Sequence, residues 1–364
     1  MFKYPVYQPF MTGKEKEYVN DCLDTTWISS KGQYLAKFEG EFNKFTGVKY
    51  STAVSNGTVA IHLALVALGI GPGDEVIVPT FTYIASVNAI AYTGAKPVFV
   101  DSLKSTWQMD PEDVEKKITP ATKAIMAVHL YGYPCDMERL QGICKKHNLL
   151  LVEDCAEAFG SYFKGKHVGT FGDVSTFSFF GNKTITTGEG GMVVTNDQTL
   201  YDRLVHLKGQ GLAKHRQYWH DAIGYNYRMT NICAAIGLAQ IENAKPIIAK
   251  KRKIAETYRQ QLEGLPLKVL WQDSETVNSF WMVTIGLEDS SIRDEFRAHL
   301  EKAGIETRPT FYPVHTMPMY LKKLEKHPVA EQLGWAGVNL PSYPGLNESD
   351  VVEISNCIKT YFKK

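Results

Sequence analysis

The chain has 364 residues, of which 44% are hydrophobic and 22% are charged, a composition that excludes a disordered protein. Its 40 Lys and Arg residues nearly balance its 39 Asp and Glu residues, which excludes a globally basic nucleic-acid-binding protein. No apolar run reaches the roughly 18 residues of a membrane span. From the charge balance and the missing span together, we expect neither a nucleic-acid nor a membrane partner. At about 150 residues per domain, this length predicts two domains.

The six cysteines and ten histidines are scattered along the chain. No two cysteines show CxxC spacing and no HExxH motif occurs, so we expect neither a disulfide framework nor a metal site. The first ten residues lack the long apolar stretch of a signal peptide. Free thiols are typical of a reducing compartment, and we expect the protein to be cytoplasmic.

The first 50 residues or so are expected to be helical and to pack on the large domain that follows. After them, strands and helices alternate. Six short apolar runs predict strands over residues 75–79, 97–101, 124–129, 149–153, 175–180 and 192–195. Such runs with helix-length spacers are typical of a mostly parallel α/β sheet that has helices on both faces. Ligands bind such sheets at the carboxyl ends of the strands, so the residues that follow each strand are the first candidates for a site.

The sequence pattern changes near residue 245. We therefore predict a large domain over residues 1–245 and a smaller C-terminal domain over residues 246–364. Pro246 suits the first turn of a long helix that ends near Leu262. The elements predicted beyond it are a strand over 280–287, a helix over 292–303, a strand over 305–308 and a last helix over 349–362.

Ser55-Asn56-Gly57-Thr58 opens an apolar helix that is predicted to run to about Leu68. The start of a helix offers free backbone N–H groups and the positive end of the helix dipole, which together suit a phosphate. Gly57 lets the backbone come close to such a ligand. The same residues also fit an ordinary helix cap, and the motif alone does not decide between the two.

Two charged residues follow predicted buried strands. Asp154 comes directly after strand 149–153, where a carboxylate needs a positive partner. A ring-nitrogen cation is one such partner, and a structural salt bridge or a helix cap is the alternative. Lys183 lies just past strand 175–180. A lysine that loses its water there has a lowered pKa and becomes a nucleophilic amine that can form a Schiff base with an aldehyde.

A phosphate cradle, a carboxylate and a lysine in this order fit pyridoxal 5′-phosphate. The carboxylate would keep the pyridine nitrogen protonated, and the protonated ring would then take up the electrons of a substrate carbanion. The lysine would hold the aldehyde and later move a proton. These residues therefore predict an enzyme with pyridoxal 5′-phosphate as its cofactor.

Longer motifs surround these residues, namely VEDCAEA at 152–158, FSFFGNK at 177–183 and GEGGM at 188–192. They resemble the motifs of the DegT/DnrJ/EryC1/StrS family of nucleotide-sugar aminotransferases. The resemblance continues through residues 55–58, 128–136, 224–231 and 308–320, and so covers nearly the whole chain. It implies the type I aminotransferase fold, with a mostly parallel sheet in the large domain and a smaller C-terminal α/β domain. It also implies a homodimer with active sites at the subunit interface.

The resemblance implies roles for individual residues. Lys183 matches the lysine that forms the Schiff base, and Asp154 matches the partner of the pyridine nitrogen. Tyr83 falls where the family stacks an aromatic ring on the cofactor; a role as a core aromatic is the alternative. Gly57, Thr58 and Ser178 match positions at the cofactor phosphate, and Asn226 matches a residue that reaches this phosphate from the neighbouring subunit. Glu157 falls near the cofactor hydroxyl, at a position where many members carry His or Gln.

The resemblance also implies the reaction. L-Glutamate is the expected amino donor, and a nucleotide-linked keto sugar is the expected acceptor. Some family members are sugar dehydratases in which a histidine replaces the Schiff-base lysine, so Lys183 favours amine transfer. The stretches 24–32, 176–192 and 308–320 most resemble family members that act on a GDP-linked sugar, and this resemblance implies transfer to C4 of GDP-4-keto-6-deoxy-D-mannose, which gives GDP-perosamine, a precursor of the lipopolysaccharide O-antigen.

Several points stay open at this level. Trp27, Arg308 and His315 are our candidates for the sugar-nucleotide pocket, and a structural role is equally open for each of them. The acceptor could instead be a dTDP- or UDP-linked keto sugar, or the amine could enter at C3. A non-catalytic, pyridoxal-phosphate-binding regulatory protein of the same fold is the alternative from another functional class.

Overall fold

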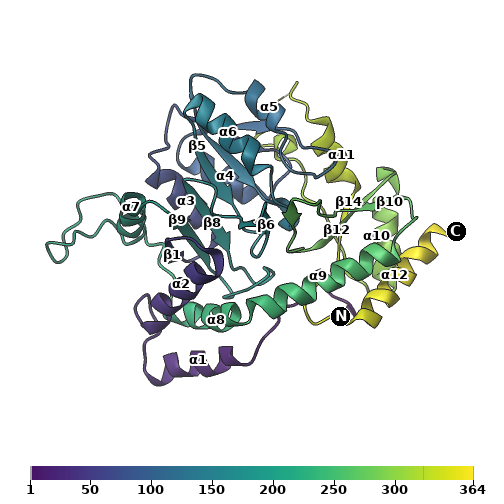
Figure 1. The fold of residues 1–364 in the computed structure, drawn as a ribbon, viewed down its shortest axis with the longest axis horizontal. Coiled ribbons are helices and arrows are strands. Elements are labelled where there is room, and N and C mark those ends of the chain that lie inside the picture. The colour runs from purple at the N-terminus through teal and green to yellow at the C-terminus, as the bar shows by residue number, and fades with distance from the viewer. Residues whose placement is uncertain (1, 323, 364) are drawn as a thin grey trace.

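A seven-stranded sheet lies at the centre of the larger part of the chain (Figure 1). The computed structural model describes residues 2–322 and 324–363. The strand order is β1-β9-β8-β5-β4-β2-β3; β9 is antiparallel to β1 and β8, and the other neighbouring pairs are parallel. The strands are β1 (Tyr50–Val54), β2 (Glu75–Pro79), β3 (Lys96–Val100), β4 (Thr122–Val128), β5 (Leu150–Asp154), β8 (Val174–Ser178) and β9 (Gly191–Thr195). The prediction of a mostly parallel sheet is confirmed.

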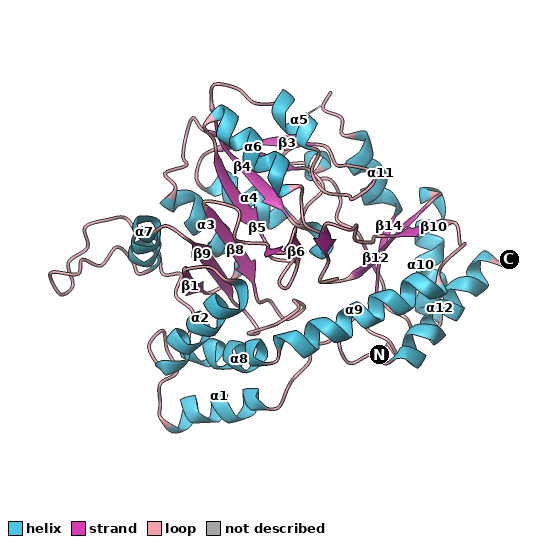
Figure 2. Ribbon diagram, viewed as in Figure 1, coloured by secondary structure: helices cyan, strands magenta, loops and turns pink. Residues whose placement is uncertain are grey.

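Helices cover both faces of this sheet (Figure 2). One face packs against α3 (Gly57–Ala67), α4 (Ile84–Tyr92) and α7 (Gln198–Lys208). The opposite face packs against α2 (Gln33–Thr46), α5 (Pro111–Lys116), α6 (Met137–His147) and α8 (Asn231–Glu242), with α1 (Lys14–Asp24) lying on the outer side of α8. The expectation of helices on both faces is therefore confirmed.

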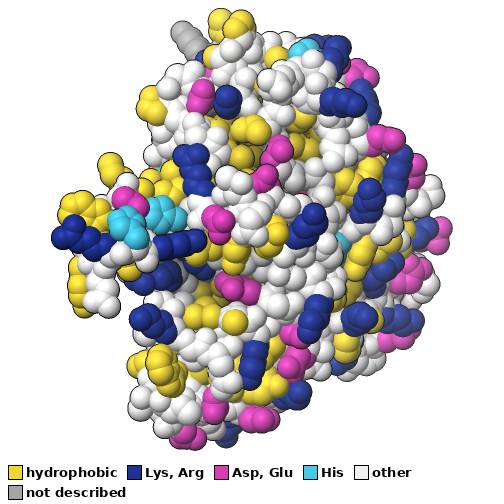
Figure 3. Space-filling view, turned by 60° about the vertical axis from the view of Figure 1, so that its left-hand side comes forward, with side chains coloured by type: hydrophobic (Ala, Val, Ile, Leu, Met, Phe, Trp, Pro, Cys, Tyr) yellow, Lys and Arg dark blue, Asp and Glu magenta, His cyan; other side chains and the backbone are white. Residues whose placement is uncertain are grey.

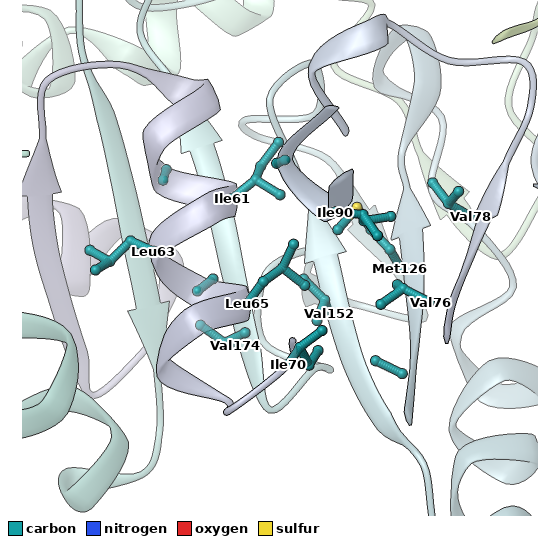
Figure 4. Packing of buried hydrophobic residues seen from close by; sticks show 14 of the residues in the cluster. Ile61, Leu63, Leu65, Ile70, Val76, Val78, Ile90, Met126, Val152 and Val174 are labelled. Atoms are coloured by element: carbon teal, nitrogen blue, oxygen red, sulfur yellow. The ribbon is translucent and has the colours of Figure 1, made fainter. Parts of the chain in front are cut away.

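The strands are apolar because they bury side chains on both faces. In β4, Met126 packs against the α3 and α4 side, whereas its neighbour Ile125 packs against the α5 and α6 side. Figure 4 shows the first of these cores, in which Ile61 and Leu65 of α3 meet Val152 of β5. Successive side chains of a strand point to opposite faces, so a near-continuous apolar run is required here.

Aromatic rings join α2 to the strand that leads toward Lys183. Phe38 and Phe42 of α2 are fully buried, and the ring of Phe38 lies 5.2 Å from the ring of Phe179. Helix α8 comes close to this cluster at Gly237, where a Cβ atom would stand 2.8 Å from the Phe38 ring. The packing of the N-terminal helices therefore supports the segment just before the candidate Schiff-base lysine.

The C-terminal part is built on a four-stranded antiparallel sheet in the order β10-β12-β14-β13. The long helix α9 (Ala244–Gln261) runs from the first sheet to this one (Figure 1). A small sheet in the order β11-β6-β7 pairs a strand from each part of the chain. The elements are β6 (Tyr162–Phe163), β7 (Lys166–His167), β10 (Leu267–Val269), β11 (Thr276–Val277), β12 (Val283–Leu287), β13 (Arg308–Pro309), β14 (Gly337–Leu340), α10 (Arg293–Lys302), α11 (Pro328–Ala336), α12 (Glu348–Phe362) and three single-turn helices, Leu130–Gly132, Ser290–Ile292 and Val314–Thr316.

Several details differ from the sequence-based expectations, which also lacked β10, β14 and α11. Strand β1, Tyr50–Val54, was not expected. The strand predicted over 280–287 begins only at Val283, because Phe280 has a positive φ of 51° and its N–H bonds the side chain of Asn278. The strand predicted over 305–308 is β13, Arg308–Pro309, and only its last residue overlaps the prediction.

The N-terminal segment is divided between the two parts. Helices α1 and α2 pack on the large sheet side, as expected. Tyr4 instead lies in the C-terminal core, where its backbone pairs with Ile305 and its hydroxyl donates to Glu353 at 2.7 Å. Across residues 2–322 and 324–363, no helix combines the length and the apolar character needed to cross a membrane.

Replacing Phe38 by Ala should lower the free energy of unfolding by about 3–5 kcal/mol, because it opens a cavity between α2, α8 and the sheet. Urea unfolding measures the change. The control is Phe2→Ala, which removes a partly exposed ring and should change the free energy of unfolding by less than about 0.5 kcal/mol. Equal effects of the two substitutions would contradict this description of the core.

Candidate active site

A cavity of about 540 Å³ lies at the carboxyl ends of β5 and β8, beside the start of α3. Two of its lining residues, Trp281 and Phe311, come from the C-terminal part of the chain. The cavity brings together seven residues predicted from the sequence: Gly57, Thr58, Tyr83, Asp154, Glu157, Ser178 and Lys183. Residues that are far apart in the sequence thus line one cavity.

The start of α3 forms a cradle for an anion. Asn56 caps the helix by accepting from the N–H of Val59 at 3.0 Å. Within the described part of the chain, no acceptor bonds the N–H groups of Gly57 and Thr58, which are therefore free for a ligand. A Cβ atom at Gly57 would stand 2.8 Å from the Cβ of Ser178, so only glycine leaves the space open. Free N–H groups, a helix dipole and the Ser178 hydroxyl suit a phosphate.

Asp154 is the last residue of β5 and is only 4% exposed. Its Oδ2 accepts from the hydroxyl of Ser86 at 2.7 Å, and its Oδ1 accepts from the N–H of Ala156 at 3.0 Å. These bonds orient the carboxylate within the cavity lining. A buried carboxylate with two neutral donors can still take a positive partner, and the protonated ring nitrogen of pyridoxal 5′-phosphate fits that requirement. Sequence reasoning missed Ser86.

Lys183 lies in the loop that follows β8. Burial lowers the pKa of the Lys183 ammonium below its ordinary value, and the charges of Glu157 and Asp154 oppose this shift. The loop backbone is held by the hydroxyl of Tyr7, which donates to the carbonyl of Lys183. The Nζ atom lies 3.9 Å from the centre of the Trp281 ring. A lysine in these surroundings is a better nucleophile near neutral pH than an exposed lysine.

Glu157 shares the cavity with Lys183 and Asp154. Burial raises the pKa of Glu157 to about 7, and the negative charge of Asp154 adds to this shift. The positive charge of Lys183 and a hydrogen bond from the N–H of Tyr131 oppose it. The Tyr131 N–H donates to Oε2 at 2.7 Å. Glu157 can therefore carry a proton near neutral pH, as its predicted place near a cofactor hydroxyl would require.

Aromatic side chains form one wall of the cavity. Tyr83 is 55% exposed, and its ring lies 5.4 Å from that of Phe311. Trp281 stacks on Tyr131 with 6.2 Å between ring centres and 6° between planes. The exposed ring of Tyr83 is free to pack on a planar ligand, which agrees with its predicted role. Sequence reasoning missed Trp281 and Phe311, because no local motif marks them.

A hydrogen-bonded group lies directly behind Asp154. Glu153 is completely buried and accepts from His129 Nε2 at 3.1 Å, from Ser175 at 3.0 Å and from three backbone N–H groups of residues 169–172. Together with Cys155, His129 and Glu153 have the side-chain types of a metal site. Because five donors already occupy the two oxygens of Glu153, we interpret this group as a structural brace for the end of β5.

Four predicted residues lie outside this cavity. Asn226 is exposed and accepts from the guanidinium of Arg228 at 3.2 Å. Trp27 is 56% exposed in the connection between α1 and α2. Arg308 is exposed and bonds Glu306 at 2.7 Å. Within a single chain, these three side chains and His315 therefore lie apart from the predicted site residues that line the cavity.

His315 is buried within the C-terminal part. Its Nδ1 lies 2.7 Å from the hydroxyl of Thr80, and its Nε2 lies 3.3 Å from Glu331. Both ring nitrogens are thus engaged by protein groups, and the side chain holds the segment after β2 to the C-terminal part. This arrangement corresponds to the structural alternative that the sequence left open for His315.

The cavity fits pyridoxal 5′-phosphate on several independent features. The start of α3 offers the phosphate cradle, Asp154 offers a buried carboxylate for the ring nitrogen, and Lys183 offers an amine with a lowered pKa. A planar aromatic cofactor would also have Tyr83 beside it.

The fold and the site define a class of protein. The family model of the DegT/DnrJ/EryC1/StrS aminotransferase family matches residues 9–359, and the chain belongs to that family. A solved structure of the putative sugar aminotransferase Spr1654 from Streptococcus pneumoniae in its PLP form has a TM-score of 0.94 at 28% identity, covering 99% of this chain and 98% of that one. The type I aminotransferase fold is confirmed, and the protein is an aminotransferase.

Closely similar relatives share one name. GDP-perosamine synthase of Escherichia coli O157:H7 is 64% identical over 358 residues, which cover 98% of each chain. GDP-perosamine synthase of Vibrio cholerae is 54% identical over 362 residues, which cover 98% of this chain and 99% of that one. The family resemblance found in the motifs therefore extends over nearly the full length.

Replacing Glu157 by Gln should change how the stability of the cofactor-free protein depends on pH. The pKa of Glu157 rises from 4.5 to about 7 in the folded state, so the folded protein binds this proton more tightly than the unfolded chain does. This stabilisation is complete below pH 4.5 and is lost as the pH rises through about 7. Gln does not titrate, so the variant does not lose this stabilisation. The difference in free energy of unfolding, variant minus wild type, should therefore increase by up to about 3 kcal/mol as the pH is raised across this range.

Urea unfolding of both cofactor-free proteins at a series of pH values measures this difference. Titrating groups that do not interact with Glu157 affect both proteins equally and cancel, whereas Lys183, whose pKa the charge of Glu157 raises, does not. Two parallel stability curves across the range would show that Glu157 does not hold a proton near neutral pH.

Proposed function

We propose that this protein moves the amino group of L-glutamate to C4 of GDP-4-keto-6-deoxy-D-mannose and so forms GDP-perosamine, a precursor of the lipopolysaccharide O-antigen. The observation that carries this proposal is the 64% identity to a GDP-perosamine synthase over 98% of both chains. The presence of Lys183 in the cavity supports amine transfer over the dehydration carried out by relatives with a histidine at that position.

Different residues of the cavity would bind different parts of pyridoxal 5′-phosphate. When bound, this cofactor supplies an aldehyde that accepts an amino group and a ring that takes up electrons. The N–H groups of Gly57 and Thr58 and the hydroxyl of Ser178 would bind its phosphate. Asp154, held by Ser86, would keep a proton on the ring nitrogen. Tyr83 would cover one face of the ring.

Lys183 would bond the cofactor at rest and move a proton during the reaction. A lowered pKa lets its amine accept a proton from the substrate carbon and return it. Glu157 would share a proton with the cofactor hydroxyl, since its own pKa lies at about 7. The aromatic wall with Trp281 and Phe311 would exclude water from the reacting atoms.

The site is proposed to be completed by a second copy of the chain. The segment after α7 stands out from the body of the protein (Figure 1) and carries apolar, basic and histidine side chains (Figure 3). Within it, Tyr218 is 93% exposed and Ile223 is 90% exposed, which is costly for a free surface and typical of an interface. Asn226 follows directly and is proposed to reach the phosphate site of the partner subunit. Trp27 and Arg308, both exposed, stay candidates for the sugar-nucleotide pocket of such a homodimer.

The six cysteines are free, and four of them are buried. Free thiols persist in reducing compartments, so we propose that the enzyme works in the cytoplasm.

The proposed reaction can be followed through the visible absorption of the bound cofactor. L-Glutamate alone should remove the visible band, and GDP-4-keto-6-deoxy-D-mannose should then restore it, because each half-reaction changes the form of the cofactor. The Lys183→Ala variant should bind the cofactor without completing this cycle, since it lacks the amine that moves the proton.

Each other outcome identifies a different error. Loss of the band with glutamate and no return with the GDP sugar would contradict the acceptor, and dTDP- and UDP-linked keto sugars would then be tested in the same way. No response to glutamate would contradict the donor and favour the regulatory alternative. Full turnover by Lys183→Ala would contradict the site itself.

Mixed dimers test whether subunits share the site. Lys183→Ala lacks the lysine, and Asn226→Asp places a carboxylate where the partner's phosphate would lie, so each variant alone should be nearly inactive. If Asn226 acts across the interface, mixing the two by refolding gives some dimers with one intact site. The mixture should recover about a quarter of wild-type activity on statistical grounds. No recovery, with mixed dimers confirmed by native mass spectrometry, would show that Asn226 acts within its own chain.

A further inference from the structure

The Nζ atom of Lys183 faces a tryptophan ring. Within residues 2–322 and 324–363, no hydrogen bond and no ion pair within 4.0 Å is formed by this atom, although Asp154 and Glu157 line the same cavity. The Nζ atom lies over the ring of Trp281, 3.9 Å from the ring centre. A cation within about 6 Å of an indole face is attracted by the negative face of the ring, and Trp is the most effective of the aromatic residues.

The indole is held in place from three sides. Its Nε1 donates to the carbonyl of Asn182, the residue before Lys183, at 2.7 Å. Its ring stacks on Tyr131. The backbone carbonyl of Trp281 accepts from Nζ of Lys251 at 3.0 Å; this lysine lies in α9, is completely buried, and also donates to the carbonyl of Ser342 at 2.9 Å. The position of the ring over the amine is therefore a fixed feature of the fold.

We propose that Trp281 is a positioning residue whose ring face binds the ammonium of Lys183 whenever this lysine is not bonded to the cofactor. The inference rests on the proposed role of Lys183 as the cofactor lysine. A long flexible lysine side chain that is not bonded to the cofactor can adopt several rotamers. Contact with the indole restricts it to one place, so the amine stays within reach of the reacting carbon for proton transfer and for its return to the cofactor.

The contact also affects the protonation of the amine. Asp154 and Glu157 favour the ammonium and burial opposes it. Glu189 and Tyr83 also line the cavity, and among the described residues of the C-terminal part the lining comprises the uncharged Trp281 and Phe311. A ring face that binds the cation adds to the stabilisation of the ammonium. Replacing Trp281 by Leu keeps an apolar surface and removes the ring, so the pKa of Lys183 should fall further.

The test uses cofactor-free protein and the rate at which an amine-acylating reagent modifies Lys183, followed by mass spectrometry of its peptide at a series of pH values. In Trp281→Leu, the midpoint of the pH dependence should lie about one pH unit below that of wild type. Trp281→Phe retains a weaker ring face, so its midpoint should lie between the two.

The matched control is Trp271→Leu. Trp271 also lies under a cation, with the Arg259 guanidinium 4.5 Å from its ring centre, but it is not part of the cavity lining. Its replacement should leave the Lys183 midpoint unchanged. An unchanged midpoint in Trp281→Leu, or an equal shift in Trp271→Leu, would overturn the proposal.

Circular dichroism shows whether Trp281→Leu folds. If Trp281→Leu does not fold, the test uses Trp281→Phe. A midpoint of Lys183 acylation below that of wild type then supports the proposal, and an unchanged midpoint overturns it. The measurement needs neither glutamate nor sugar. Failure of wild-type enzyme to aminate the GDP sugar would therefore refute the proposed function without affecting this result, and an unshifted midpoint in an active enzyme would refute the inference alone.

Discussion

The structure depends on one constraint: a carboxylate and an amine must both be buried at the carboxyl edge of a parallel sheet without forming an ion pair with each other. Asp154 is held by Ser86 and the N–H of Ala156, and Lys183 lies against Trp281. Each charge is thus kept in a low-water environment and available to a ligand. Pyridoxal 5′-phosphate, when bound, would offer a positive ring nitrogen to Asp154 and an aldehyde to Lys183.

Other parts of the fold serve this arrangement. The brace around Glu153 fixes the end of β5, and the aromatic packing of α2 fixes the segment before Lys183. The C-terminal part contributes Trp281, anchored through its carbonyl by Lys251 on α9. Tyr7 of the N-terminal segment bonds the carbonyl of Lys183. The loop that carries the lysine is therefore held by groups from both ends of the chain.

Most of the large sheet could be predicted, because strands buried on both faces leave continuous apolar runs in the sequence. Strand β1 was missed because its YSTAV sequence begins with three hydroxyl-bearing residues and gives no such run. The gathering of Gly57, Asp154 and Lys183 in one cavity could be predicted, because each of them ends or follows a strand or opens a helix; their roles toward the cofactor stay predictions. Trp281 and Ser86 could not, because tertiary packing brings them to the cavity from distant segments. Asn226 lies outside the cavity of its own chain, and its role across a dimer interface stays a prediction.

The most direct measurement follows the nitrogen itself. L-Glutamate carrying a heavy-nitrogen label is incubated with the enzyme and GDP-4-keto-6-deoxy-D-mannose, and the sugar nucleotide is analysed by mass spectrometry. The account predicts that the label appears as an amine in the GDP sugar with wild-type enzyme and not with Lys183→Ala. A wild-type enzyme that leaves the label in glutamate, or a Lys183→Ala variant that transfers it, would contradict the account.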